Sequence, residues 1–132
     1  FEPKWLIAKG VKKTFKLTKL TKSVLFARFL NWVTPTKKTF NGHNTSCYKN
    51  DLLLVNGFNE EMQYGGLDRE LGERLFNLGL LAKQIRYHAI CVHLFHERSY
   101  AKPEIWQSNN AIRAFNKKNK ITTIDSGIRN IK

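Results

Sequence analysis

Asp68 is the residue whose type and position most suggest chemistry in this sequence. It comes just after Gly65 and Gly66, where the pattern predicts that a loop enters a helix. Glycines let the backbone approach a ligand closely, and a helix N-terminus supplies N–H donors and a field that favours an anion. A carboxylate at such a place stays ionised and can take the proton of a substrate hydroxyl as a general base. The alternative interpretation is an ordinary helix N-cap, which the residue type alone favours.

His93 and His96 are candidate ligands for a divalent metal at the end of a predicted strand. A neutral imidazole is a common metal ligand. Because side chains alternate along a strand, the two rings are expected to point to opposite faces, so at most one is a ligand unless the chain turns. Each histidine has a structural alternative, a ring held by hydrogen bonds in the fold. Asp51, Asp68 and Asp125 are the only aspartates, so there is no Asp-x-Asp motif and a metal site needs ligands from elsewhere.

Other motifs with a known chemistry are missing from the sequence. It contains no P-loop, no Gly-x-Gly-x-x-Gly and no Gly-x-Ser-x-Gly. The two cysteines, Cys47 and Cys91, cannot form a disulfide framework, and they offer no cluster at zinc-finger spacing. This cysteine usage favours a reducing compartment.

The 132 residues are 42% hydrophobic, 12% aromatic and 25% charged, as expected for one compact domain or part of one. This composition argues against collagen, a wholly disordered chain and a disulfide-rich scaffold. No apolar run approaches the roughly 18 residues of a transmembrane helix, and the start at Phe1 and Glu2 is unlike a secretory signal peptide. We expect a soluble or peripheral protein that is part of a longer chain.

The net charge of +13 is carried by the two ends of the sequence. Residues 1–38 contain ten basic residues and one acidic residue, residues 117–132 contain five and one, and residues 39–116 contain eight of each. A domain that reads nucleic-acid bases along one face does not usually distribute its charge in this way. The two arms are instead expected to attract polyanions in general, such as phosphate, an acidic polymer or an anionic membrane.

The N-terminal segment, residues 4–33, mixes lysines with apolar side chains at spacings that loosely fit an amphipathic helix. One interpretation is a basic surface that docks on anionic lipid. The other, more common for amphipathic helices, is a helix that packs on the rest of the domain with its lysines in solvent. The helix is expected to stop at Thr34-Pro35-Thr36, because proline disfavours helix continuation.

The rest of the sequence predicts short strands and helices. Leu71, Leu75 and Leu78 at helical spacing, with Gly79 after them, predict a helix over about residues 68–78. The other expected elements are a strand and loop over 39–48, a short helical turn capped by Asn50 or Asp51 and closed at Asn56-Gly57, a loop over 60–66, a strand over 82–95 buried on at least one side, and a last helix opened by Pro103.

The segment from Phe40 to Glu97 resembles the C-terminal half of inverting GT-A glycosyltransferases of family 2 and the related galactosyltransferase C-terminal region. FNGHNTS resembles the F-x-G-x-N-x-S segment of the family, DLLLVNGFNEE resembles D-x-L-x-x-V-N-G-F-D-E, YGGLDREL resembles W-G-G-E-D-x-E/D-L, and ICVHLFHE resembles the closing strand with its histidine. Each motif alone is unspecific, but four in order at natural separations form a strong signal. The resemblance covers 58 of the 132 residues and leaves the basic arms unmatched.

This resemblance implies an α/β fold class, namely the C-terminal portion of a GT-A nucleotide-sugar transferase fold, incomplete without an upstream nucleotide-binding half. The expected parts are a basic, partly amphipathic N-terminal segment (1–38), an acceptor-side and catalytic portion (39–102), and a C-terminal helix with a basic tail (103–132). The implied function is an inverting glycosyltransferase that moves a sugar from a nucleotide-sugar donor to a saccharide acceptor hydroxyl, in bacterial surface polysaccharide synthesis.

The resemblance also assigns roles to single residues. Asp68 is implied to be the catalytic base, and His96 the third ligand of a Mn or Mg ion with His93 as the alternate ligand. The implied substrate-binding residues are Tyr64, where the family often has an aromatic that stacks on sugar, Gly65, Gly66 and Asn44. Leu67 departs from the pattern, because the family usually has a glutamate there that hydrogen-bonds the acceptor.

The remaining half of the metal site, with its Asp-x-Asp motif, is expected upstream of this chain, so the isolated chain is predicted to be inactive. The expected location is cytoplasmic, or peripheral at the inner membrane face through the basic arms, with no specific nucleic-acid partner. Two alternatives stay open. One is a basic peripheral module that binds membrane or nucleic acid without catalysis, and the other is a glycosyltransferase-like domain without activity.

Overall fold

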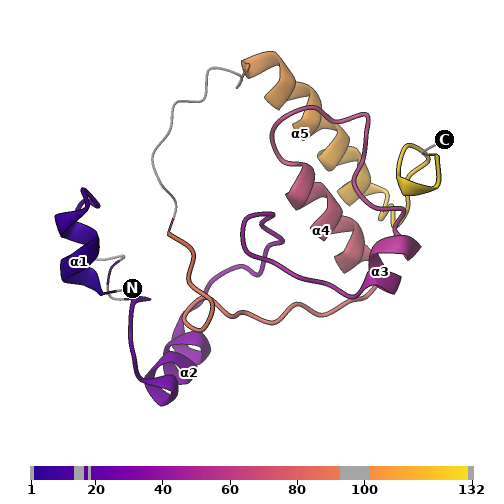
Figure 1. Cartoon of the computed structure of the whole chain (residues 1–132). Helices are drawn as coiled ribbons and strands as arrows, with labels where there is room; N and C mark the ends of the chain where they lie inside the picture. The colour runs from indigo at the N-terminus through magenta and orange to yellow at the C-terminus, as the bar shows by residue number, and fades with distance from the viewer. Residues whose placement is uncertain (1, 14–16, 18, 93–101, 131–132) are drawn as a thin grey trace. The chain divides into compact units, whose positions relative to one another are not determined.

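The computed structural model describes residues 2–13, 17, 19–92 and 102–130. The helices within these ranges are α1 (Pro3–Ala8), α2 (Val24–Val33), α3 (Lys49–Leu54), α4 (Leu67–Asn77), α5 (Pro103–Lys118) and the short 3₁₀ helix η2 (Ile128–Asn130), as Figure 1 shows. The chain divides into two compact units: the first comprises residues 1–37 and 83–93, and the second comprises residues 38–82 and 94–132.

The expected α/β fold class is wrong for this chain. Every regular element in the described ranges is a helix and none of these residues lies in a strand, so they do not form a portion of a GT-A fold. An alternating pattern marks one face of an extended segment as apolar, but a strand also needs a neighbouring chain that completes its backbone hydrogen bonds. Helices complete their backbone hydrogen bonds locally, and every regular element of the described residues is a helix.

The strand expected over residues 82–95 is replaced by extended chain and a tight turn. The backbone N–H groups of His88 and Ala89 both donate to the Ile85 carbonyl at 2.9 Å, so the hydrogen bonds close locally. The part of this predicted strand from His93 onward lies outside the described residues.

The strand expected over residues 39–48 is also absent, because its first residues pack on a helix. Phe40 lies so close to Gly72 of α4 that a Cβ atom at residue 72 would overlap the Phe40 side chain. Further along, the Gly42 N–H donates to Asp68 Oδ2 at 2.9 Å, at the beginning of α4. Residues 40–42 therefore lie along α4 as an extended segment.

α4 confirms the helix expected over about residues 68–78 and begins one residue earlier. Gly66 at its N-cap has a φ of 85°, a left-handed conformation that glycine adopts without steric cost. Asp68 and Glu70 lie in its first turn and Arg74 in its last, and these charges complement the helix dipole.

The apolar core of the second unit gathers on one face of α4. Leu71 and Leu75 lie one helical turn apart and are buried together with Val55. The side chains that cover this cluster are Phe40, Leu52 and Leu80.

A fully buried ion pair lies beside this apolar cluster. Arg74 donates from Nε to Glu70 Oε1 at 2.7 Å and from Nη2 to Glu70 Oε2 at 2.8 Å. The same guanidinium donates to the carbonyls of Val55 and Gly57, and Asn116 donates from Nδ2 to Glu70 Oε1 at 2.7 Å. Each buried charge thus has several partners, as a low-dielectric interior requires. The network joins α4 and α5 to the turn that follows α3.

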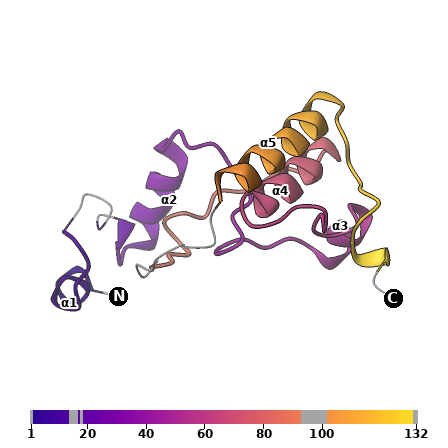
Figure 2. The same cartoon turned by 90° about the horizontal axis from the view of Figure 1, so that it is seen from above.

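α5 confirms the last helix, which Pro103 opens as expected. Figures 1 and 2 both show α4 and α5 side by side. Hydrogen bonds show that they run in the same direction, because Asn109 Nδ2 donates to the Gly65 carbonyl at 2.7 Å before α4 begins, and Asn77 Nδ2 donates to the Asn116 carbonyl at 3.4 Å where α4 ends.

α3 confirms the short helical turn that was expected to close at Asn56-Gly57. Tyr48 occupies its N-cap, so the prediction of Asn50 or Asp51 as the cap is wrong. Asn56 has a φ of 63°, and its side chain holds the C-terminal segment by donating to the Ile124 carbonyl at 2.8 Å.

In the described part of the first unit, α1 and α2 are separate helices, where one amphipathic helix was expected over residues 4–33. α1 is followed by Gly10 in a left-handed conformation, with a φ of 92°. α2 starts after Ser23, whose Oγ accepts the Phe26 N–H at 3.3 Å, and it stops at Val33 before the predicted break at proline.

Residues 83–92 pack against α2 within the first unit. Asn31 of α2 accepts the Tyr87 N–H at 3.2 Å through Oδ1 and is hydrogen-bonded to His88 through Nδ2. The Thr34 hydroxyl lies 3.2 Å from the Tyr87 hydroxyl. One face of α2 is thereby occupied by its own unit.

Candidate functional site

Asp68 lies at the beginning of α4 with its carboxylate partly exposed. Its Oδ2 accepts the Gly42 N–H at 2.9 Å, and its Oδ1 accepts the Arg69 N–H at 2.8 Å. A carboxylate offers about four lone-pair positions, so these two bonds leave acceptor capacity for a substrate hydroxyl. The carboxylate is fixed in direction by the two backbone groups and is not sealed in the interior.

The loop before Asp68 packs on an aromatic side chain of α5. Gly65 has a φ of 110°, and a Cβ atom there would lie 2.9 Å from the Trp106 ring. Tyr64 meets the same ring edge-on, with the ring centroids 6.4 Å apart. Both aromatic side chains are exposed in part. Tyr64 lies four residues before Asp68 in the sequence, and Trp106 packs against the same loop.

The Asn109 side chain of α5 stabilises the loop before Asp68. The Asn109 side chain is buried and donates to the Gly65 carbonyl at 2.7 Å and to the Gln63 carbonyl at 3.0 Å. The Arg113 side chain lies against Gly66 and pairs with Glu73 at 2.6 Å. α5 thus positions the glycine loop, and through it the beginning of α4.

Asn44, an implied substrate-binding residue, lies in the turn that contains Gly42, which is a hydrogen-bond partner of Asp68. Its N–H donates to the Asn41 carbonyl at 2.9 Å, which closes a four-residue turn around Gly42. Of the implied residues, the structure therefore brings Asp68, Tyr64, Gly65, Gly66 and Asn44 to one region of the second unit.

The implied metal ligands, His93 and His96, lie outside the described residues. Within the described part of the chain, no group of three or more His, Cys, Asp or Glu side chains could hold a metal ion. The described residues therefore do not by themselves form a Mn or Mg site.

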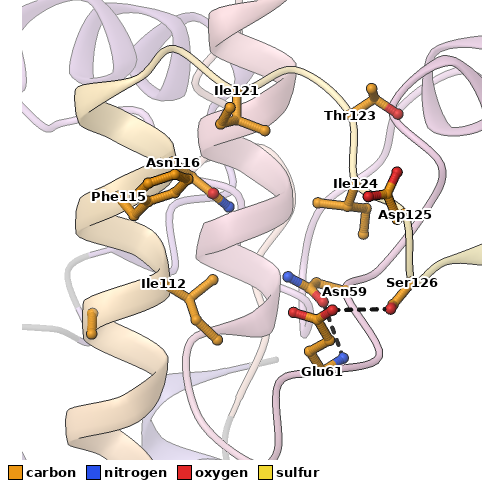
Figure 3. A pocket seen from close by; sticks show the side chains of 11 residues that line it. Asn59, Glu61, Ile112, Phe115, Asn116, Ile121, Thr123, Ile124, Asp125 and Ser126 are labelled. Atoms are coloured by element: carbon orange, nitrogen blue, oxygen red, sulfur yellow. Dashed lines mark hydrogen bonds between the residues drawn. The ribbon is translucent and has the colours of Figure 1, made fainter.

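A cavity of about 490 Å³ lies elsewhere on the second unit (Figure 3). Its lining includes apolar side chains of α5 and of the following segment: Ile112, Phe115, Ile121 and Ile124. Glu61 contributes a carboxylate, which accepts a hydrogen bond from the Ser126 hydroxyl at 3.1 Å. The cavity borders the C-terminal half of α5, whereas Asp68 lies at the N-terminal end of the parallel α4. It is therefore separate from the region around Asp68.

Sequence reasoning missed Trp106 and Asn109 as parts of this region. An indole side chain in the first turn of the last helix was a visible signal, but its partner loop lies 41 residues away in the sequence.

Comparison with known proteins adds no assignment: no family model matches the chain, and neither a curated protein nor a solved structure matches it. As for membrane insertion, none of the helices in the described ranges combines the length and the apolar character that a membrane span needs.

Proposed function

We propose that this chain is the acceptor-binding and catalytic-base part of an inverting glycosyltransferase. It would transfer a sugar from a nucleotide-sugar donor to a hydroxyl of a saccharide acceptor. The resemblance of residues 40–97 to family 2 glycosyltransferases suggests the reaction. The observation that carries the proposal is the Asp68 carboxylate, which is partly exposed, fixed by two backbone N–H groups and still able to accept another hydrogen bond.

The aromatic pair at the loop that precedes Asp68 supports a saccharide as the acceptor. Sugar rings present C–H faces that pack on aromatic rings, and Tyr64 and Trp106 offer such surfaces with part of each ring exposed. Gly65 and Gly66 carry no side chain that would obstruct this approach.

The proposed step is a single displacement. The acceptor hydroxyl oxygen forms a bond to the anomeric carbon of the donor, its proton goes to Asp68, and the bond from that carbon to the nucleoside diphosphate breaks with the electron pair leaving on phosphate. One base is sufficient, because attack from the side opposite the leaving group inverts the configuration. The nucleotide-binding residues are proposed to come from another segment of the protein.

The proposed setting is bacterial surface polysaccharide synthesis at the cytoplasmic side of the inner membrane. A second candidate function, a basic peripheral module without catalysis, is favoured by one observation. Residues 1–37 and 83–93 contain eleven lysines and arginines and a single acidic residue, Glu2. The two candidates differ in whether they need Asp68: sugar transfer requires its carboxylate, whereas binding of membrane or nucleic acid by the basic residues does not.

The test is sugar transfer by the complete protein that contains this chain, measured with labelled nucleotide sugars and a panel of oligosaccharide acceptors. Asp68→Asn keeps an oxygen that can accept the Gly42 N–H but removes the base, so we expect transfer to fall by about 10²–10⁴-fold with an unchanged circular dichroism spectrum. Tyr64→Ala and Trp106→Ala are expected to raise the KM for the acceptor more than they change kcat.

Asp51→Asn is the matched control, because Asp51 is also a partly buried carboxylate in the first turn of a helix. It is expected to leave transfer unchanged. Wild-type transfer rates in the Asp68→Asn variant, or no transfer by the complete protein with any donor, would exclude the proposal.

A further inference from the structure

We infer that α2 docks the protein on membranes that contain anionic phospholipid. This inference is independent of sugar transfer and concerns the first unit alone. Leu25, Phe29 and Trp32 recur at helical spacing on one side of α2, and their side chains are 76%, 52% and 83% exposed. An isolated exposed apolar side chain is ordinary on protein surfaces, but a continuous stripe on one helix marks an interaction surface.

The exposed side chains of α2 form one connected apolar surface. The rings of Phe26 and Phe29 stack with their centroids 6.5 Å apart, and the rings of Phe29 and Trp32 are 6.4 Å apart. Val24 and Val33, at the two ends of the helix, are also exposed.

The opposite face of α2 is already occupied, which fixes the stripe outward within the first unit. Ala27 is buried there, and Asn31 is hydrogen-bonded to Tyr87 and His88. The exposed stripe therefore cannot be covered by rotating the helix without breaking these bonds.

The charge of the first unit selects an anionic partner. Its residues include eleven lysines and arginines and one acidic residue, whereas the second unit has twelve basic and nine acidic residues. The one acidic residue, Glu2, is paired with Lys22 at 2.6 Å. Arg28 lies within α2, and Lys22 and Lys37 flank it in exposed positions. Basic side chains around an apolar helix face are typical of helices that lie in the interface of an anionic membrane.

The length of α2 is consistent with a helix that lies in the membrane plane. Its ten residues span about 15 Å at the usual helical rise, about half of the hydrocarbon thickness. Trp32 and the two phenylalanines are side chains that favour the boundary between headgroups and acyl chains. A nucleic acid would satisfy the charge, but its grooves would leave the Leu25, Phe29 and Trp32 stripe without an apolar partner.

The experiment measures binding of the 132-residue chain to vesicles by co-sedimentation. One set of vesicles is phosphatidylcholine alone, and the other contains about one third phosphatidylglycerol, an anionic lipid. We expect binding only to the anionic vesicles. Leu25→Ser/Phe29→Ser/Trp32→Ser and, separately, Lys22→Gln/Arg28→Gln/Lys37→Gln are each expected to lower the partition coefficient by about tenfold or more.

The matched control replaces exposed apolar residues of the second unit by serine: Tyr48, Leu81 and Phe115. Leu81 is 97% exposed, so its removal changes total exposed apolar surface without touching α2. This control variant is expected to bind like the wild type. Equal binding by the α2 serine variant, or no binding to anionic vesicles, would overturn the inference.

A second measurement does not depend on the triple variant being folded. In a Trp5→Phe/Trp106→Phe background, Trp32 is the single tryptophan that remains. We expect its fluorescence to be quenched by phosphatidylglycerol vesicles with brominated acyl chains. Unquenched fluorescence would overturn the inference. The inference would also be overturned if the chain did not bind vesicles and the α2 stripe were instead needed for self-association or for binding an oligonucleotide.

Discussion

Asn116 of α5 donates from Nδ2 to Oε1 of Glu70 on α4 at 2.7 Å, inside the second unit. The same Glu70 oxygen accepts from Arg74 Nε, also at 2.7 Å. A hydrogen bond between helices and an ion pair within one helix therefore share a single buried atom. The position of α5 beside α4, and with it the loop before Asp68, depends on this shared contact.

Arg74→Leu is expected to destabilise the chain by about 3–5 kcal/mol, because it leaves the Glu70 carboxylate buried without its cation. Urea unfolding followed by circular dichroism measures this loss. Arg113→Leu is the control, since it removes the less buried pair with Glu73 and should cost about 1 kcal/mol or less. Equal losses in the two variants would contradict the role of the network.

Gly72→Ala separates helix propensity from packing. In an exposed helix this change would stabilise by about 1 kcal/mol, but at residue 72 the new Cβ overlaps Phe40. Overpacking of this kind typically costs about 1–3 kcal/mol, so we expect a net loss of stability in thermal unfolding. Adding Phe40→Gly, which removes the Cβ atom that the new methyl group overlaps, should recover part of the loss of Gly72→Ala. A stabilised single variant would show that residues 40–42 do not lie along α4.

Gly65→Ala and Gly79→Ala form a matched pair, because both glycines have left-handed φ angles, 110° and 92°. At Gly79 a Cβ meets no atom within 4 Å, so only backbone strain of about 1–2 kcal/mol is expected. At Gly65 the Cβ also meets Trp106 at 2.9 Å, and we expect a further loss of about 1–3 kcal/mol together with a changed tryptophan fluorescence spectrum. Identical effects of the two substitutions would argue against the loop packing on Trp106.

Partial burial raises the pKa of the Cys47 thiol, and the nearby Asp51 carboxylate adds to this effect. A raised pKa means less thiolate at a given pH, so alkylation of Cys47 by iodoacetamide is expected to be slow near neutral pH and to accelerate above the ordinary thiol range. In a Cys91→Ser background, Asp51→Asn should lower the pKa and speed the reaction at pH 8. A rate unchanged by Asp51→Asn would show that the carboxylate does not act on the thiol.

Local patterns predicted α4 and α5 well. The leucine spacing over 71–78, the glycine after it and Pro103 act within a few residues of the chain, and helices form their hydrogen bonds over the same distance. The two strand predictions failed because pairing needs a second chain segment, which a single alternating pattern does not specify. Residues 40–42 instead packed on α4, where Gly72 leaves room for Phe40.

The sequence by itself determined that Asp68 follows a glycine loop at the start of a helix and that basic residues concentrate near the N-terminus, because both are properties of neighbouring residues. Only the tertiary structure decided that Trp106 and Asn109 support that loop, that Glu70 and Arg74 are buried together with Asn116, and that the aromatic side of α2 faces outward. Those relationships join segments tens of residues apart or depend on which helix face is covered. They follow from packing in three dimensions, which no local spacing encodes.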